Sequence, residues 1–359
     1  MAPIILGAKH RSSVSHYLVA TGQQDSLFDK ATTDFGLCVD HYLGRHLGTL
    51  GIENQIGAMR KAIGDMLLEQ RPDLVLVQGD TNSAYAAALA ADDKNIAVGH
   101  VEAGLRSHIV DRPWPEERNR LAIGQIAVLH FAPSQCALDN LIQEKAPGIA
   151  VLTGNPGIDA LMMIASPPPV SKQISDQAIN HILVTCHRRE NFGAPLLNIC
   201  RALNSIAERH DVIINMPLHS NSQVRLKVTA ELGKNPRIRL VDPLGYHDMI
   251  TAVRSVRLVI SDSGGLQEEC AALGVPLILM RDETERPEVV ASQNCILTGA
   301  DPQRIIAETS RLLDDPVHHA RMSQPIFPYG QGNAAKHILD AIELIGRSSS
   351  LRFGSAFDM

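Results

Sequence analysis

LVISDSGGLQEECAALGVPLILMRDETERPE, residues 258–288, is the stretch of the sequence that decides the fold. Residues 258–260 are strand formers, and the serines and glycines of residues 261–265 break that pattern. Apolar side chains then recur at helical spacing as far as Gly274, and residues 275–280 form a second apolar run. A strand, a glycine turn, a helix and a buried strand in this order predict one unit of a parallel α/β sheet.

The glycine turn is a candidate anion site. Gly264 and Gly265 open the predicted helix, and the lack of side chains there lets the backbone approach a ligand closely. The free N–H groups and the dipole of a helix N-terminus suit a phosphate, to which Ser263 can add a hydroxyl. Glu269 lies one turn further on, where a carboxylate could accept hydrogen bonds from ribose hydroxyls. An ordinary strand-to-helix turn with a serine cap accounts for the segment equally well.

Length and composition indicate the class of protein. A chain of 359 residues predicts two domains, and 45% hydrophobic with only 4% aromatic residues predicts aliphatic cores. The formal net charge is -6 and no basic block appears, which argues against nucleic acid or an anionic membrane surface as a partner. There is no apolar run of membrane-spanning length and no signal peptide, and the six cysteines include no C-x-x-C pair. These features predict a cytoplasmic protein with free thiols.

Predicted strands and helices alternate along the chain, which favours parallel sheets with helices on both faces. Further strands are predicted at residues 16–21, 74–77, 96–100, 128–132, 181–185, 212–215 and 239–241, with helices at residues 56–68 and 84–91. Residues 111–120 are predicted to form a loop.

A proline cluster at residues 166–169 predicts a stiff linker, after which the alternation of strands and helices restarts. We therefore predict two Rossmann-like domains facing a cleft. The first domain would comprise residues 1–158, with a C-terminal helix at residues 334–359 packing back onto it, and the second would comprise residues 159–333.

Three carboxylates are candidates for acid–base chemistry. Asp80, Glu102 and Glu116 are predicted at or just past strand ends, where open α/β sheets bind ligands. Convergence on one edge would provide the groups that proton transfer requires. For any one of them alone, a structural role is the commoner explanation. Asp80 would then cap the following helix, while Glu102 and Glu116 would pair with Arg106 and Arg120.

A second charged cluster, His-Arg-Arg-Glu at residues 187–190, follows a predicted strand. His187 can give or take a proton and Arg188 offers forked donors, so the cluster suits a diphosphate. A lone cysteine such as Cys186 is more often a packing residue than a nucleophile. The glycines of residues 330–335 follow no strand, and predict the turn before a last helix. No H-E-x-x-H or comparable cluster appears, so we predict no metal site.

Seven short motifs occur together and in order along the chain. They are QGDT (residues 78–81), HVEAGLR (100–106), PEERNR (115–120), TGN (153–155), HRRE (187–190), SDSGG (261–265) and RDETERPE (281–288). Together they resemble the non-hydrolysing UDP-N-acetylglucosamine 2-epimerases, and the resemblance extends over residues 1–335.

The resemblance implies a fold and an activity. It implies the two-domain glycosyltransferase-B fold, no cofactor, no required metal and a cytoplasmic homodimer formed through the first domain, where the apolar face of the helix at residues 56–68 could serve. It also implies an isomerase of UDP-sugars that interconverts UDP-GlcNAc and UDP-ManNAc for cell-envelope polysaccharide synthesis. Such epimerases eliminate UDP to give 2-acetamidoglucal, then add UDP back with C2 inverted.

The resemblance also assigns roles by position. Catalytic roles fall on Asp80, Glu102, Glu116 and His187, with the identity of the base left open among the carboxylates. Substrate-binding roles fall on Arg120, Arg188, His219, Ser263, Gly264, Gly265, Glu269 and Arg286, with the serine and glycines holding the diphosphate and Glu269 the ribose.

The sequence departs from the family pattern near its start. Family members begin with a strand and a Gly-Thr-Arg-Pro-Glu loop, whereas here the Met-Ala-Pro segment is at residues 1–3, so we expect the first domain to lack its first strand. Gln24 stands where the family commonly has histidine, and residues 216–221 are a variant of its Pro-Val-His segment, which argues against allosteric control by substrate. The alternatives are an epimerase of a related UDP-diacetamido sugar, a retaining glycosyltransferase and a truncated binding relative without catalysis.

Overall fold

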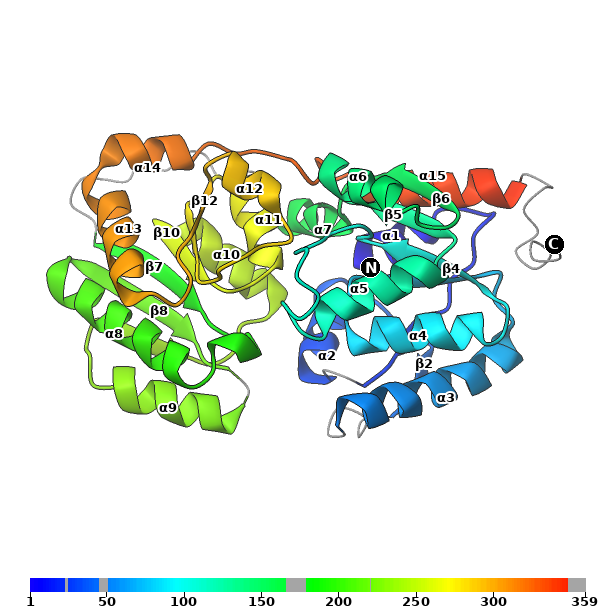
Figure 1. Cartoon of the computed structure of the whole chain (residues 1–359), viewed down its shortest axis with the longest axis horizontal. Coiled ribbons are helices and arrows are strands. Elements are labelled where there is room, and N and C mark those ends of the chain that lie inside the picture. Colours follow the sequence, from blue (N-terminus) through cyan, green and yellow to red (C-terminus); the bar gives the residue numbers. More distant parts are fainter. Residues whose placement is uncertain (23–24, 45–50, 166–178, 220, 348–359) are drawn as a thin grey trace. The chain divides into compact units, whose positions relative to one another are not determined.

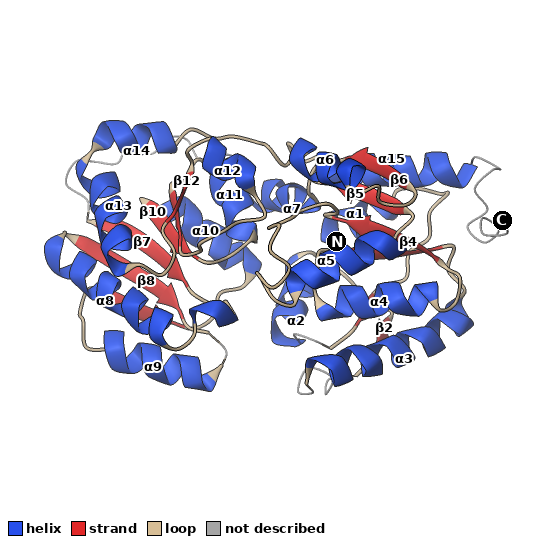
Figure 2. Ribbon diagram, in the orientation of Figure 1, coloured by secondary structure: helices blue, strands red, loops and turns tan. Residues whose placement is uncertain are grey.

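The computed structural model describes residues 1–22, 25–44, 51–165, 179–219 and 221–347 (Figure 1). The chain divides into two compact units, unit 1 with Met1–Ala160 and Tyr329–Met359, and unit 2 with Leu161–Pro328. Each unit is an α/β structure in which helices flank parallel strands (Figure 2). The predicted proline linker at residues 166–169, Gln24 and the last part of the predicted C-terminal helix lie outside the described residues.

Unit 1 is built on a sheet of four parallel strands in the order β3-β4-β5-β6. These strands are β3 (Leu74–Gln78), β4 (Ala97–Val101), β5 (Leu129–Ala132) and β6 (Ile149–Leu152). A separate parallel pair joins β1 (Val19–Ala20) to β2 (His41–Tyr42), so the strand predicted at residues 16–21 is only 2 residues long. The other strands predicted for this unit are confirmed, whereas β2 and β6 were not predicted.

Helices cover both faces of this sheet (Figure 1). The helices of unit 1 are α1 (Ala2–Ala8), α2 (Asp25–Asp34), α3 (Ile52–Gln70), α4 (Asn82–Asp92), α5 (Glu116–Ile126), α6 (Gln135–Gln143) and α15 (Ala334–Arg347). Helix α7 (Pro156–Ala165) begins in unit 1 and continues into unit 2, which starts at Leu161. Val75 and Val77 of β3 pack with α3 and α4, while Leu74 and Leu76 pack with α1 and α15. Alternate residues of one strand therefore face two different helical layers, as a two-sided sheet requires.

The apolar face of α3 is used within unit 1. Met59, Ile63 and Leu67 are buried against the alanine-rich helix α4. Alanines let two helices approach closely, and the close approach covers this face. The prediction that this face could serve a dimer interface is therefore wrong.

Unit 2 is built on six parallel strands in the order β12-β11-β10-β7-β8-β9. These strands are β7 (Asn180–Thr185), β8 (Val212–Pro217), β9 (Ile238–Val241), β10 (Leu258–Ser261), β11 (Leu277–Leu279) and β12 (Cys295–Leu297). Read from the other edge, this is the doubly wound order of dinucleotide-binding sheets, whose direction reverses between β7 and β10. The predicted strands of this unit are confirmed, and the reversal marks where a ligand is expected.

The remaining helices of unit 2 flank this sheet. They are α8 (Ala194–Arg209), α9 (Ser222–Leu232), α10 (Tyr246–Ser255), α11 (Gly265–Leu273), α12 (Pro287–Ala291), α13 (Pro302–Asp314) and α14 (Pro316–Met322), with a short 3-10 turn at Arg189–Asn191. The glycine end predicted for α11 is confirmed, because Gly274 has φ +65° and a Cβ there would lie 2.6 Å from the Ser323 carbonyl oxygen. Glycine tolerates both constraints.

Candidate active site

The reversal point of unit 2 brings two of the predicted motifs side by side. Thr185 ends β7 and pairs in register with Ser261, which ends β10, and their hydroxyls are 2.6 Å apart. His187 and Arg188 follow β7, while the SDSGG glycine turn follows β10. Parallel strands place both segments at the same carboxyl edge, where doubly wound sheets bind ligands.

Asp262 holds the segment that carries His187. This carboxylate is completely buried, and it accepts backbone N–H bonds from His187 at 3.0 and 3.1 Å and from Arg188 at 2.9 Å. The side-chain amide of Asn191 donates a further bond at 2.9 Å. The His187 ring, 48% exposed, has Nδ1 3.2 Å from Asp262 Oδ1. The predicted catalytic histidine is thus fixed by a carboxylate that sequence reasoning missed.

His219, at the end of β8, belongs to the same edge of the sheet. Its ring packs edge-on against Phe192 with ring centroids 5.6 Å apart, and Nδ1 accepts a bond from the Asn221 backbone N–H at 2.8 Å. Burial lowers the pKa of His219, and the neighbouring His187 lowers this pKa further. His219 is therefore a partly buried neutral ring beside His187.

The N-terminus of α11 is bordered by guanidinium groups. A Cβ on Gly264 would lie 3.1 Å from Arg286 Nη1 and 3.4 Å from Arg188 Nη2. Gly264 forms no side-chain cap, and Gly265 is exposed. The Leu266 N–H donates to Ser263 Oγ at 3.5 Å, so the serine cap considered from the sequence is present. A Cβ on Gly264 would also lie 3.2 Å from Glu285 Oε1, so the glycine backbone gives an anion a close approach beside two cations and one carboxylate.

Buried carboxylates hold these arginines in place. Glu285 is 2% exposed, accepts a hydrogen bond from Arg286 Nη1 at 2.5 Å, and forms ion pairs with Arg281 Nη2 at 2.8 Å and with Arg188 Nη2 at 3.7 Å. Glu268 lies 2.6 Å from Arg286 Nε. Arg286, predicted to bind substrate, is itself 4% exposed, so only its tip near Gly264 can reach a ligand.

Glu269 lies one turn into α11, as predicted, and is partly exposed. The Tyr246 hydroxyl, at the start of α10, donates a hydrogen bond to the Glu269 carboxylate. Burial raises the pKa of Glu269, and the hydrogen bond from Tyr246 opposes that rise. Burial and the adjacent Glu269 also raise the pKa of Tyr246. Tyr246 therefore orients the carboxylate that we expect to contact ribose.

In unit 1, Asp80 follows β3 on a turn that its neighbours fix. Gly79 has φ +68°, and its carbonyl oxygen lies 2.8 Å from His100 Nε2. Burial lowers the pKa of His100 to about 4, so this ring is neutral at ordinary pH. Thr81, and not Asp80, caps α4 by accepting from the Ala84 N–H. The capping role considered for Asp80 is wrong, because the hydroxyl one residue later takes that bond.

Arg120 joins Asp80 to α5. Its guanidinium is 2% exposed and lies 2.6 Å from Asp80 Oδ2, while its Nη1 pairs with Glu117. Asn119 also donates to the Asp80 carbonyl oxygen at 2.8 Å. The pairing considered between Glu116 and Arg120 is wrong, since residue 117 faces Arg120 across one helical turn. Arg120, predicted to bind substrate, is enclosed between two carboxylates.

Glu102 lies in a left-handed backbone conformation at the end of β4. Its φ is +65°, and its Oε2 lies 3.4 Å from Gln78 Nε2. A Cβ on Gly79 would lie 3.8 Å from that Oε2, so Glu102 adjoins the Asp80 turn. The pairing considered with Arg106 is wrong, because Arg106 binds Glu144 at 2.6 and 2.8 Å instead. A glutamate in this conformation is strained, and such strain is concentrated at functional sites.

We expect Glu102→Gly to be more stable than Glu102→Ala by about 1 kcal/mol, because only glycine relaxes at this φ. The two variants are matched, since both remove the carboxylate and should therefore lose activity together. Urea unfolding followed by the fluorescence of Trp114, the single tryptophan of the chain and a residue of unit 1, measures the difference. Equal stability of the two variants would show that the backbone at this position is unstrained.

Glu116 is not at a strand end, and the predicted loop at residues 111–120 is wrong from this residue onward. Glu116 and Glu117 form the first turn of α5, behind Pro115 as its N-cap. Two acidic residues there favour helix formation through the helix dipole. Glu116 is partly exposed, whereas Glu117 is 1% exposed and also accepts from the Ser107 N–H at 3.1 Å.

The sequence analysis did not identify several residues that hold the candidate site residues of the two units in place. They are Asp262, Glu285 and Tyr246 in unit 2 and Glu117 in unit 1. Asp262 and Glu285 lie inside the SDSGG and RDETERPE motifs, and Glu117 stands three residues before Arg120, the spacing of a helical ion pair. The partners of Glu117 and Glu285 lie within four residues in the sequence, whereas those of Asp262 and Tyr246 come from distant parts of the chain.

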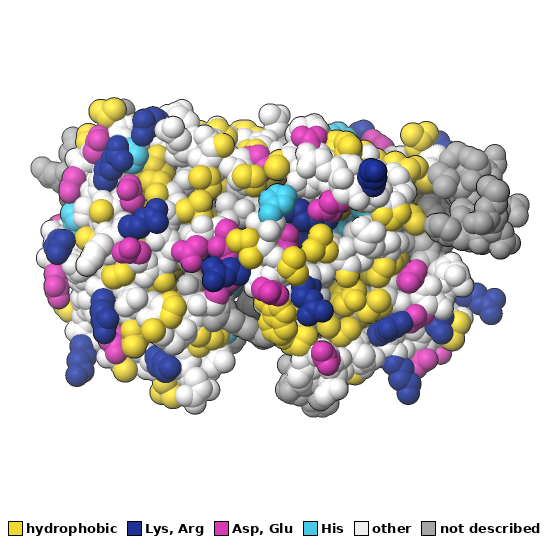
Figure 3. All heavy atoms as spheres, in the orientation of Figure 1, with side chains coloured by type: hydrophobic (Ala, Val, Ile, Leu, Met, Phe, Trp, Pro, Cys, Tyr) yellow, Lys and Arg dark blue, Asp and Glu magenta, His cyan; other side chains and the backbone are white. Residues whose placement is uncertain are grey.

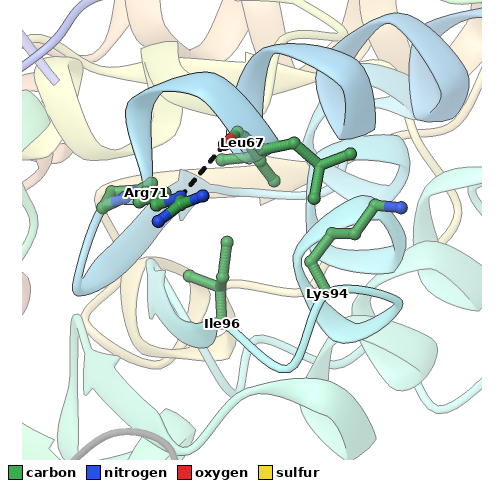
Figure 4. Close-up of a pocket in the computed structure, with 6 residues that line it drawn as sticks. Leu67, Arg71, Lys94 and Ile96 are labelled. Carbon is green, nitrogen blue, oxygen red and sulfur yellow. Dashed lines mark hydrogen bonds between the residues drawn. The ribbon is translucent and has the colours of Figure 1, made fainter.

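A hollow of about 250 Å³ lies elsewhere in unit 1 and includes none of the predicted site residues. Leu67 and Arg71 at the end of α3 face Lys94 and Ile96 across it (Figure 4), and the Arg71 N–H donates to the Leu67 carbonyl oxygen at 3.0 Å. These residues precede β3 and β4, so the hollow is at the amino edge of the sheet, away from Asp80.

Surface charge, metal-ligating clusters and long apolar helices are the features that would indicate a charged partner, a metal ion or a membrane. On the face shown in Figure 3, basic and acidic side chains are intermingled. Among the described residues, no group of three or more His, Cys, Asp or Glu side chains could hold a metal ion. No helix within the described ranges is long and apolar enough to cross a membrane.

The doubly wound sheet, with a glycine-rich helix N-terminus and arginines at its reversal point, is typical of nucleotide-binding α/β proteins. The profile of the UDP-N-acetylglucosamine 2-epimerase family matches residues 7–343, and the chain belongs to this family.

Individual relatives extend over nearly the whole chain. The chain is 37% identical over 355 residues to the UDP-N-acetylglucosamine 2-epimerase of Escherichia coli K12, covering 96% of this chain and 94% of the relative. The structure of UDP-GlcNAc 2-epimerase from Neisseria meningitidis bound to UDP-GlcNAc matches with a TM-score of 0.91 and 33% identity, covering 96% of each chain. A trehalose-6-phosphate synthase structure matches with a TM-score of 0.53 and 11% identity over 81% of this chain and 79% of that chain, which shows a shared glycosyltransferase fold alone.

Proposed function

We propose that this chain interconverts UDP-GlcNAc and UDP-ManNAc by eliminating UDP to 2-acetamidoglucal and adding UDP back. The observation that carries the proposal is the presence, at the family's motif positions, of both kinds of group that elimination requires. Unit 1 supplies Asp80, Glu102 and Glu116, and unit 2 supplies His187 with a glycine-rich helix N-terminus beside arginines. Proton removal needs the first kind, and a departing diphosphate needs the second.

The bonding changes of the proposed reaction balance without a redox cofactor. A carboxylate takes the proton from C2, the C–H electron pair forms the C1=C2 double bond, and the C1–O pair leaves with UDP. Re-addition of UDP to C1, with a proton delivered to the other face of C2, gives the epimer. The Ser263, Gly264 and Gly265 turn and Arg286 would hold the diphosphate, and Glu269 would hold the ribose.

Heavy water tests the reaction class. Purified protein incubated with UDP-GlcNAc in D₂O should give UDP-ManNAc and UDP-GlcNAc that both carry deuterium at C2, read by proton NMR. Deuterium enters because the C2 proton exchanges with solvent while it resides on the protein. Epimerisation with no deuterium at C2 would rule out this mechanism, and no turnover by folded protein would favour a binding relative without catalysis.

The nucleoside site is tested by calorimetry with UDP alone. Glu269→Ala should weaken UDP binding by roughly 1.5–3 kcal/mol, because it removes a charge-assisted contact in a half-buried site. Glu231→Ala is the matched control, since Glu231 is an exposed residue of α9 in the same unit. Unchanged UDP affinity in Glu269→Ala would remove this residue from the site.

The same proposal includes the location, the assembly and the biosynthetic role of the enzyme. We expect a cytoplasmic homodimer that supplies precursors for cell-envelope polysaccharides. The dimer surface would differ from the α3 face of Met59 and Ile63, which α4 already covers. Light scattering at micromolar concentration measures the assembly, and a monomer there would contradict this part of the proposal.

A further inference from the structure

His100 is a buried histidine beside the turn that carries Asp80. It lies on β4, is 1% exposed, and its Nε2 is 2.8 Å from the Gly79 carbonyl oxygen. A carbonyl oxygen can only accept a hydrogen bond, so Nε2 must carry the proton that is donated. Burial lowers the pKa of His100 to about 4, and the ring is therefore neutral, with its single ring proton on Nε2.

The backbone of the Gly79–Asp80 turn is held on several sides. The Gly79 N–H donates to the Val101 carbonyl oxygen at 3.0 Å, and the Gly79 carbonyl oxygen accepts from His100. The next carbonyl oxygen, that of Asp80, accepts from the buried side-chain amide of Asn119 at 2.8 Å. Two successive carbonyl groups are thus bonded to buried neutral donors, and these bonds fix the orientation of the backbone from which the Asp80 side chain extends.

The backbone and the carboxylate of this turn are held by different side chains. A neutral ring has one proton to donate, and that proton is directed at the Gly79 carbonyl oxygen. His100 therefore donates to the backbone and not to the Asp80 carboxylate. The carboxylate instead pairs with Arg120, whose guanidinium lies 2.6 Å from Asp80 Oδ2. Removal of the His100 donor would leave that ion pair in place but release one carbonyl group of the turn.

His130, on the neighbouring strand β5, is bonded in the same way to a different turn. The register of β4 and β5 pairs His100 with His130, so the two side chains lie on one face of the sheet. His130 is also 1% exposed, its Nε2 lies 2.7 Å from the Pro147 carbonyl oxygen, and burial lowers its pKa. Pro147 precedes β6 and is not a candidate site residue. The two histidines therefore share their burial and kind of bond, but only His100 bonds the turn of Asp80.

We propose that His100 is a positioning residue that holds the Asp80 carboxylate where it can reach the C2 proton of the substrate. The inference rests on the proposed function for its catalytic meaning. His100 touches no substrate atom, since its Nε2–H fixes the Gly79 carbonyl group and the peptide that follows places the Asp80 side chain. A neutral donor suits this place, because it fixes the turn without bringing a further cation to a carboxylate that must take a proton.

Leucine and glutamine variants separate the donated bond from the packing of the ring. His100→Leu keeps an apolar body of similar size without a donor. It should slow epimerisation and deuterium entry at C2 by roughly 10²-fold, the loss expected when a catalytic group is displaced by about 1 Å. His100→Gln keeps an N–H donor and should recover most of this rate. Affinity for UDP should stay unchanged in both variants, since the residues proposed to hold UDP belong to unit 2. An unchanged rate in His100→Leu would overturn the proposal.

His130→Leu is the matched control for a merely structural role. It removes the same kind of ring from the same face of the sheet, so it should lower the urea midpoint of unit 1 about as much as His100→Leu does. The rate of epimerisation should nevertheless stay as it is, because the bond that is lost holds Pro147. Equal losses of rate in the two variants would show that both histidines act only by stabilising unit 1, and the proposal would fail.

Crystal structures of the two leucine variants test the positioning without any turnover. The turn at Gly79 and Asp80 should shift relative to Arg120 in His100→Leu and stay in place in His130→Leu. A turn that stays in place in both variants would contradict the proposal. If the unmodified protein showed no epimerisation, the proposed function would fail, and these structures would still decide whether His100 holds the turn.

Nuclear magnetic resonance of the unmodified protein tests the donated bond without reliance on the folding of any leucine variant. Long-range ¹H–¹⁵N spectra at neutral pH should show His100 and His130 as neutral Nε2–H forms, because each ring donates to a carbonyl oxygen. His100→Gln and His130→Gln assign the two signals. An Nδ1–H form of His100 would mean that the Gly79 carbonyl receives no bond from this ring, and the proposal would be wrong.

Discussion

Glu117→Ala should lower the free energy of unfolding of unit 1 by about 3–5 kcal/mol, the usual loss when one partner of a buried ion pair is removed. Glu117 is 1% exposed and Arg120 2% exposed, so water does not replace the lost carboxylate. Arg120 would keep its ion pair with Asp80 but lose its buried partner Glu117, and the Ser107 N–H would lose the Glu117 carboxylate as its acceptor. Urea unfolding followed by Trp114 fluorescence reports on this unit, since Trp114 lies two residues before α5.

The control compares a buried ion pair with an exposed one. Asp93→Ala breaks the pair between Asp93 and Arg60 in the same unit, whose side chains are 40% and 43% exposed. Solvent screens that pair, so its loss should shift the unfolding midpoint far less. Glu117→Gln should fall between the two, because it keeps an acceptor but no charge. Similar midpoints for Glu117→Ala and Asp93→Ala would show that the buried cluster does not stabilise unit 1.

The strand ends were the part of the site that could be predicted from the sequence. Runs such as residues 74–77 and 258–260 carry a local pattern of β-formers followed by glycine or polar residues. Parallel sheets bring their carboxyl ends to one edge, and this general rule is enough to assign Asp80 and His187 to such edges. Strands β6 and β12 were missed although they are 4 and 3 residues long, the same lengths as the predicted strands β10 and β11, so length alone does not decide which strands can be predicted.

The partners of charged side chains could not be predicted. Arg106 pairs with Glu144 and Arg120 with Asp80, and these pairs span 38 and 40 residues of chain. Sequence spacing favours nearby partners, whereas tertiary packing chooses among all carboxylates that reach the same point. Glu117 illustrates this limit of sequence-based prediction. It is the neighbour of Glu116, and only the rotational position of each residue around the axis of α5 decides which side chain is buried.

Asp80→Asn should lower the rate of epimerisation and of deuterium entry at C2 by about 10²–10⁴-fold, the range for loss of a proton-transfer group. The substitution keeps the size of the side chain and an oxygen for Arg120, which holds Asp80 Oδ2 at 2.6 Å. It removes the charge and therefore the ability to take a proton. Affinity for UDP should stay unchanged, because the residues proposed to hold UDP belong to unit 2. Calorimetry with UDP checks this in the same preparations.

Two further variants are needed to interpret the reaction rate of Asp80→Asn. Asp92→Asn makes the same chemical change at an exposed position of α4 in unit 1 and should leave the rate as it is. His187→Asn should also slow the reaction while UDP still binds, but through C1–O cleavage and not through removal of the C2 proton. Deuterium entry at the normal rate in Asp80→Asn would mean that Asp80 is not the base. The same measurement on Glu116→Gln and Glu102→Gln would then identify the carboxylate that takes the proton.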